Sequence, residues 1–263
     1  MFKKVIWPLI LVSSLALSII FIGGFVASVN VSKSEEENQT EKPMESMQSL
    51  PEESDEIPTD SSEILILGDS IGFGIGDEEE LGIGGRYLDL IAKEGQEKKA
   101  VKNSSIPGYE SADLVKSIKS GENNASILGA NLIILSIGGN DLNRLEYEDS
   151  VTLTLAFEEA LKSYKENLAA ITKEIRTINP DAQLAFIGLY NPYSEEEPEK
   201  AIFLLEWNYE TRVIVNSDVK FAYIPTYELF EYHLDDYLSI DEFHPSGLGY
   251  QVIAEVLNKI INK

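Results

Sequence analysis

The sequence predicts a doubly wound α/β sandwich, in which helices cover both faces of a parallel sheet. Three observations predict it. Short apolar runs recur along the chain, helical patterns lie between them, and polar motifs follow the ends of several runs. Runs that are apolar on both faces suit buried parallel strands, and strands that alternate with helices are typical of α/β proteins.

The apolar runs give the predicted strands, which are residues 64–67, 100–101, 132–137, 183–189 and 220–225. Residues 157–178 form the clearest predicted helix, because their apolar side chains recur at helical spacing and Asn179-Pro180 ends the pattern. Those side chains are Phe157, Leu161, Tyr164, Leu168, Ile171 and Ile175. Residues 198–215 and 248–261 are further predicted helices.

The first 30 residues read as a membrane anchor. Lys3 and Lys4 precede an apolar run over residues 5–29, which is longer than the roughly 20 residues that span a bilayer. The positive-inside rule keeps the lysines in the cytoplasm, so we expect a single-pass protein of the cell membrane with its catalytic domain outside the cytoplasm. Small residues near Ala27 leave a cleaved signal peptide, and thus a secreted protein, as the alternative.

Residues 31–62 are rich in Ser, Glu, Pro, Gln and Asp and have few large apolar residues. Such a segment buries too little surface to offset its ordering entropy, so we expect a disordered acidic linker. Residues 63–263 remain for the folded domain, a length that suits one domain with a full hydrophobic core.

Charge and cysteine content exclude several classes of function. The formal net charge of −24 repels phosphate backbones, so nucleic acid is not an expected partner. The chain has no cysteine, which excludes disulfides, thiolate metal sites and a cysteine nucleophile.

The sequence offers few candidates for a serine nucleophile and its base. Ser70 directly follows the first predicted strand, in Gly68-Asp69-Ser70, and the chain has only two histidines. A serine hydroxyl needs a base to take its proton, and an imidazole needs a carboxylate to set its tautomer. His244 has Asp241 three residues before it, whereas His233 lies in an acidic and aromatic stretch typical of a surface position.

Acyl transfer also needs hydrogen-bond donors for the developing oxyanion. Asn140, in the motif GGND, follows predicted strand 132–137, and Gly108 ends the motif NSSIPG after strand 100–101. The backbone N–H of Ser70 is a third candidate. The carboxyl ends of parallel strands share one edge of the sheet, so these groups could converge there.

These motifs, in this order, resemble the four blocks of the GDSL-type, or SGNH, ester hydrolases. The match is closest to bacterial lipase/acylhydrolase, thioesterase/lysophospholipase-like and acetylesterase-like members, and it departs at Ile71, where the family name reflects leucine. The resemblance implies a flavodoxin-like three-layer α/β/α sandwich with a five-stranded parallel sheet, and no metal or organic cofactor.

The resemblance also implies the role of each residue. Ser70 would be the nucleophile, His244 the base and Asp241 its orienter. Ser70, Gly108 and Asn140 would form the oxyanion hole.

We therefore expect a serine hydrolase of carboxylic esters, either lipid acyl or glycan O-acetyl esters, that works through an acyl-enzyme. The loops at 142–154 and 191–200 are expected to set the length of the acyl pocket. A non-catalytic cell-surface binding module on the same fold is the main alternative. Nucleotide binding by the glycine-rich stretch at 72–76 is disfavoured, because its spacing does not complete a dinucleotide motif. The oligomeric state is left open.

Overall fold

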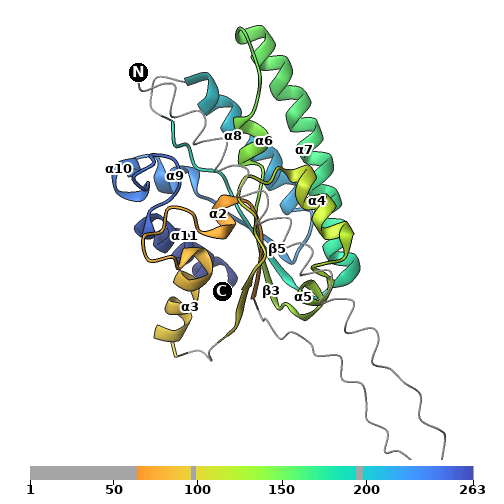
Figure 1. Cartoon of the computed structure of the whole chain (residues 1–263), viewed down its shortest axis with the longest axis vertical. Coiled ribbons are helices and arrows are strands. Elements are labelled where there is room, and N and C mark those ends of the chain that lie inside the picture. The colour runs from red at the N-terminus through yellow and green to blue at the C-terminus, as the bar shows by residue number, and fades with distance from the viewer. Residues whose placement is uncertain (1–63, 96–98, 194–197, 263) are drawn as a thin grey trace, which may run out of the picture. The chain divides into compact units, whose positions relative to one another are not determined.

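A computed structural model describes residues 64–95, 99–193 and 198–262 of the chain (Figure 1). The predicted anchor at 1–30 and linker at 31–62 lie outside the described residues. Within the described ranges, no helix has both the length and the apolar character needed to cross a membrane.

The centre of the fold is one five-stranded sheet in which all neighbouring strands are parallel. Its strand order is β2-β1-β3-β4-β5. The strands are β1 (Ile64–Gly68), β2 (Val101–Asn103), β3 (Leu132–Ser136), β4 (Gln183–Ile187) and β5 (Phe221–Ile224). Each predicted strand is confirmed, and every residue of β1 and β3 is buried, as the two-sided apolar runs predict.

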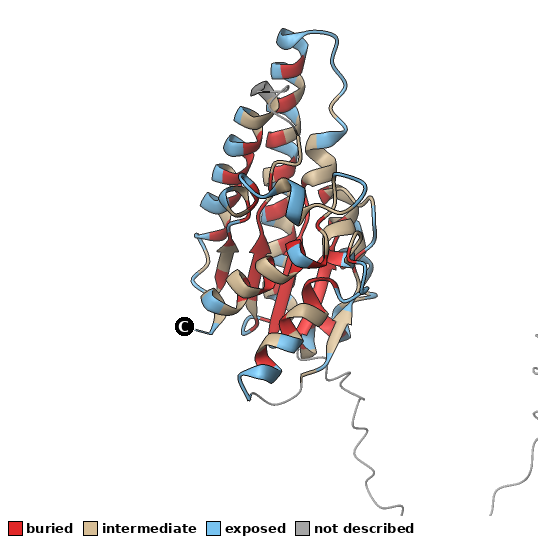
Figure 2. Ribbon diagram, turned by 90° about the vertical axis from the view of Figure 1, so that its left-hand side faces the viewer, coloured by how far each residue is buried: buried red, intermediate tan, exposed pale blue. Residues whose placement is uncertain are grey.

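Helices cover both faces of this sheet and confirm the three-layer sandwich (Figure 1). On one face lie α3 (Gly82–Lys93), α9 (Tyr227–Phe230), α10 (Leu234–Tyr237) and α11 (Gly247–Ile261). On the other lie α4 (Ser111–Ser120), α5 (Asn124–Gly129), α7 (Ser150–Ile178) and α8 (Pro198–Val215). Figure 2 shows the buried residues concentrated in the strands and on the inner sides of the helices.

The long helix α7 begins earlier than predicted. Its N-cap is Asp149, whose side chain accepts the N–H of Thr152 at 2.8 Å. Leu153 extends the buried stripe by one turn, but the exposed Val151 and Leu155 interrupt the pattern from which the start was predicted.

Helix α8 has the predicted bounds, and its two prominent aromatic residues differ. Trp207 is buried and stacks on Tyr164, with ring centroids 4.3 Å apart, as expected of a packing residue. Tyr209, two residues later, is 65% exposed. Helical periodicity did not separate the two positions, since α8 carries apolar residues on more than one side.

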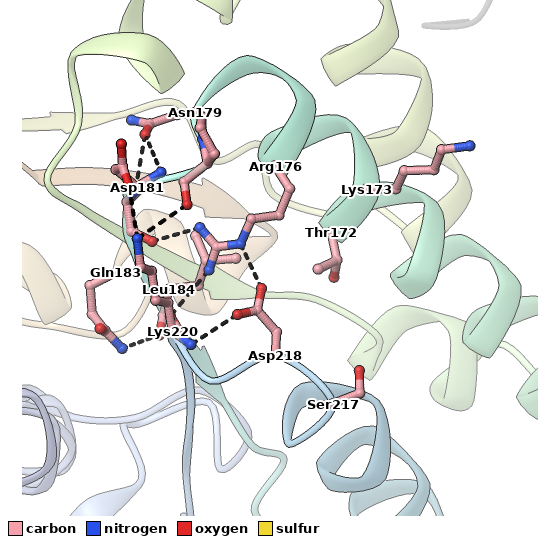
Figure 3. Close-up of polar contacts among 12 residues, drawn as sticks. Thr172, Lys173, Arg176, Asn179, Asp181, Gln183, Leu184, Ser217, Asp218 and Lys220 are labelled. Atoms are coloured by element: carbon pink, nitrogen blue, oxygen red, sulfur yellow. Dashed lines mark hydrogen bonds and ion pairs between the residues drawn. The ribbon is translucent and has the colours of Figure 1, made fainter.

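The amino ends of β4 and β5 are joined by Arg176, near the end of α7 (Figure 3). Its guanidinium donates to Asp218 at 2.5 Å and to the carbonyl oxygens of Ala182 and Lys220 at 2.6 and 3.2 Å. Lys220 in turn pairs with Asp181 at 2.8 Å. This end of the sheet is therefore occupied by structural contacts, and the carboxyl ends remain for chemistry.

Candidate active site

Ser70 lies where β1 ends, at the first position of the short helix α2 (Ser70–Phe73). Asp69 caps this helix, because its Oδ1 accepts the N–H of Ile71 at 3.0 Å and the hydroxyl of Ser136 at 3.1 Å. Burial raises the pKa of Asp69 to about 7, against the lowering effect of these hydrogen bonds. Asp69 thus positions Ser70 and lies outside the His244–Asp241 pair.

The loop before α11 places His244 against Ser70. The imidazole Nε2 lies 2.9 Å from Ser70 Oγ, and its Nδ1 lies 2.7 Å from Asp241 Oδ2. The three side chains predicted to act together therefore form one continuous chain of hydrogen bonds. The other histidine, His233, lies on the surface and stacks on Tyr237.

Asp241 is held in its ionised form. Partial burial raises the pKa of this carboxyl, but hydrogen bonds from His244, from the Ser239 hydroxyl and from backbone N–H groups outweigh that effect, so the pKa is lowered. The Ser239 bond is 2.7 Å, and Oδ1 also accepts the N–H groups of Phe243 and His244 at 3.0 and 2.9 Å. An ionised carboxylate at this position stabilises a protonated His244.

Two contacts that the sequence analysis missed support the His244 loop. Tyr190, after β4, donates its hydroxyl to the carbonyl of Phe243 at 2.7 Å. Gly76 lies so close to the loop that a Cβ there would come within 2.5 Å of the Pro245 carbonyl oxygen and 2.9 Å of His244 Cβ. This close approach explains why position 76, in the glycine-rich stretch after Ser70, requires a glycine.

Of the predicted oxyanion-hole residues, Ser70 and Asn140 line the same pocket, and Asn140 contacts the loop that carries Gly108. Among the described residues, the backbone N–H groups of Ser70 and Gly108 donate to no protein acceptor. For Ser70 this follows from its place at a helix start, where N–H groups have no intrahelical partner. Asn140, on α6 (Gly139–Asn143), donates one amide hydrogen to the Tyr109 carbonyl at 2.8 Å, which leaves the other for a ligand.

Helix α6 also holds the loop that carries Gly108, through side chains that the sequence analysis did not identify. The carboxylate of Asp141 accepts the backbone N–H of Ser111 at 2.9 Å as well as its hydroxyl. Arg144 donates to the Gly108 carbonyl at 3.1 Å and to Glu110 at 2.7 Å. The GGND motif thus contributes Asn140 and Asp141. Arg144, three residues after the motif, also holds the loop that carries Gly108.

A pocket opens beside Ser70, and its space, including the part open to solvent, is about 480 Å³. Ser70, Gly139 and Asn140 belong to its wall, and most of the remaining wall is apolar or aromatic. No group of three or more His, Asp or Glu side chains suited to a metal ion occurs in the part of the chain that the structure describes.

Comparisons with known proteins match this domain to one family of hydrolases. The model of the GDSL-like lipase/acylhydrolase family matches residues 66–252. The uncharacterized protein YpmR of Bacillus subtilis is 31% identical over 207 residues, covering 76% of this chain and 81% of that protein. The spore germination lipase LipC of Bacillus licheniformis is 27% identical over 198 residues, covering 73% and 92%.

Solved structures show the same fold. The lipase Lip_vut3 from a goat rumen metagenome aligns with a TM-score of 0.65 and 25% identity, over 74% of this chain and 95% of that chain. The acetylxylan esterase Axe2 from Geobacillus stearothermophilus aligns with a TM-score of 0.59 at 19% identity, over 76% and 94%.

Proposed function

The chain belongs to the GDSL-like lipase/acylhydrolase family and is a carboxylester hydrolase, and we propose that it uses Ser70, His244 and Asp241 as a catalytic triad. One observation carries the proposal. The contacts of 2.9 Å from His244 to Ser70 and 2.7 Å from His244 to Asp241 are those that proton transfer from a serine nucleophile requires.

In the acylation step, Ser70 Oγ attacks the carbonyl carbon of the ester while His244 Nε2 takes the hydroxyl proton. The carbon–oxygen bond to the alcohol then breaks, and His244 returns the proton to the leaving alcohol. Asp241 holds the imidazole and stabilises its charged form between the two transfers. The product of this step is an acyl-enzyme on Ser70.

The N–H groups of Ser70 and Gly108 and the free amide hydrogen of Asn140 stabilise the negative oxygen of each tetrahedral intermediate. In deacylation, His244 takes a proton from water, the hydroxide attacks the acyl carbon, and the proton passes to Ser70 Oγ as the acid leaves. The side chains for every proton transfer are present in the chain itself.

Hydrolysis of p-nitrophenyl esters from acetyl to palmitoyl by the purified full chain tests the proposal. We expect Ser70→Ala to lower kcat by at least about 10³-fold with an unchanged melting temperature. Ser105→Ala is the matched control, because Ser105 is buried next to α2 and its hydroxyl has no hydrogen-bond partner in the described structure. This control is expected to keep wild-type turnover.

Two results would contradict the proposal. Turnover by Ser70→Ala equal to that of the wild type would remove Ser70 from the mechanism. A wild-type chain that binds a glycan but hydrolyses none of the esters would support the alternative of a cell-surface binding module.

We further propose that residues 1–30 anchor the chain in the cell membrane, that residues 31–62 form a linker, and that the hydrolase domain lies outside the cytoplasm. The lysines that precede the apolar run support this orientation. Before treatment, the domain is expected in the membrane fraction. Protease added to intact cells is then expected to degrade it. Recovery of the domain from the medium without residues 1–30 would instead indicate a cleaved signal peptide.

A further inference from the structure

The pocket beside Ser70 is better suited to an alkyl chain than to an acetyl group. Besides polar side chains such as Asp69, Asn140 and Asn143, its wall contains the apolar and aromatic residues Ile71, Leu189, Tyr190, Pro192, Leu204 and Phe243. An acetyl group would leave most of this wall without contact, whereas an alkyl chain would cover it and remove its own surface from water.

A second pocket lies beside the first and is bordered by α7 and α8. Its walls include Leu142, Leu145, Tyr147, Leu153, Lys200 and Phe203. Phe203 is fixed in place because it stacks on Phe157 of α7, with ring centroids 4.3 Å apart. The two pockets share two wall residues, Asn143 at the end of α6 and Tyr193 after β4.

Tyr193 is held between the two pockets by contacts with other described residues. Its hydroxyl donates to Asn143 Oδ1, and its backbone N–H donates to Asn191 Oδ1 at 3.1 Å. The ammonium of Lys200 lies over the ring, 4.8 Å from its centroid. The ring and the Asn143 amide therefore form a partition that connects the β4 loop to α6.

We propose that the Tyr193–Asn143 contact sets the upper limit of acyl chain length, by closing the pocket beside Ser70 against the second pocket. The substrates are then esters of fatty acids whose chains fill the first pocket. This inference rests on the ester hydrolysis proposed above. Opening the contact joins the two apolar pockets and admits a longer chain.

The expected effect follows from the burial of methylene groups. Each methylene that moves from water into the pocket contributes about 0.8 kcal/mol, which is about a fourfold increase in kcat/KM. For the wild type, kcat/KM therefore rises about fourfold per methylene until the first pocket is full, and then stops rising. In a variant without the partition, the rise continues over additional methylenes that enter the second pocket.

The experiment measures kcat/KM of the full chain for p-nitrophenyl esters with even-numbered acyl chains from acetyl to palmitoyl. Tyr193→Ala removes the ring, Tyr193→Phe removes only the hydroxyl, and Asn143→Ala removes the acceptor from the other side. We expect the optimum to move to longer chains in all three, most in Tyr193→Ala. Tyr209→Ala is the matched control, because this tyrosine is 65% exposed on α8 and borders neither pocket.

An unchanged chain-length optimum in folded Tyr193→Ala and Asn143→Ala would overturn the proposal and leave the esterase mechanism intact. A second measurement separates the two ideas. Calorimetry of fatty acids from butanoate to palmitate with Ser70→Ala and with Ser70→Ala/Tyr193→Ala reports chain-length preference without turnover. If no ester is hydrolysed but the double variant binds longer acids than the single variant, the partition stands and the esterase mechanism fails. If the two bind the same lengths, the partition fails.

Discussion

Asp241 contacts both the ring and the backbone of His244. Its Oδ2 lies 2.7 Å from the imidazole Nδ1, while its Oδ1 accepts the backbone N–H of the same residue at 2.9 Å. A spacing of three residues on one turn thus lets a single carboxylate orient the ring and shape the loop that carries it.

Asp241→Asn is expected to lower kcat/KM on the order of 10³ to 10⁴-fold. An amide nitrogen facing Nδ1 favours the tautomer with its proton on Nε2, and that tautomer cannot accept the proton of Ser70. Steady-state kinetics on a p-nitrophenyl ester check this. Glu242→Gln, the neighbouring exposed acid, should keep wild-type kinetics. Equal losses in both variants would show that the loop merely requires negative charge.

Asn140→Ala is expected to lower kcat by about 10² to 10³-fold, because it removes a hydrogen bond to the oxyanion that forms as negative charge develops in the transition state. Since the ground state makes no such bond, KM should change little, and kcat and kcat/KM should fall together. Asn124→Ala, on the exposed side of α5, is the control. A rise in KM with unchanged kcat would contradict the role assigned to Asn140.

Asp69→Asn is expected to change how stability depends on pH. Because the folded pKa of Asp69 is raised from 3.8 to about 7, its contribution to stability is fully present below pH 3.8 and is lost as the pH rises through 7. Asparagine stays neutral, so the variant gains stability over the wild type across that range. The shift of about three pKa units sets the gain at about 4 kcal/mol at most.

Denaturant unfolding of both proteins at pH 5 and pH 8 measures this gain. Asp77, Asp218 and Asp241 have lowered pKa values and act in the opposite direction, but they are common to both proteins and cancel in the difference. A stability difference between Asp69→Asn and the wild type that is the same at pH 5 and pH 8 would mean that Asp69 ionises without cost in the folded chain.

Arg176→Ala is expected to lower the free energy of unfolding by about 3 kcal/mol, because Asp218 and two carbonyl groups lose their common donor. Arg176→Lys keeps the charge but loses the fork of donors, so its loss should be smaller. Lys220→Ala breaks an exposed ion pair and should cost less than about 1 kcal/mol. All three should retain wild-type kcat, since these residues lie at the amino ends of the strands. A lower kcat in the folded variants would contradict a purely structural role for this end of the sheet.

Much of the fold was predictable because buried positions recur in the sequence as a periodic pattern of apolar residues. The run at 64–67 and the stripe from Phe157 to Ile175 show which faces are covered, and both are confirmed. Helices α3, α4 and α5 were not predicted. The short helices α2, α6, α9 and α10 were not predicted either, since four or five residues are too few to display a helical period. The sequence of α8 also does not separate the exposed Tyr209 from the buried Trp207, because this helix has no clear polar face.

The sequence by itself determined the parallel α/β architecture and the residues Ser70, Gly108, Asn140, Asp241 and His244 as candidates. Only the tertiary structure decided that Ser70 and His244, 174 positions apart, come within 2.9 Å, and that Tyr193 meets Asn143 across 50 positions. The physical reason is that periodicity and short motifs report local burial and turn chemistry. Contacts between distant side chains depend on strand order, on helix packing and on loops such as the one carrying Tyr193, and none of these leaves a local pattern.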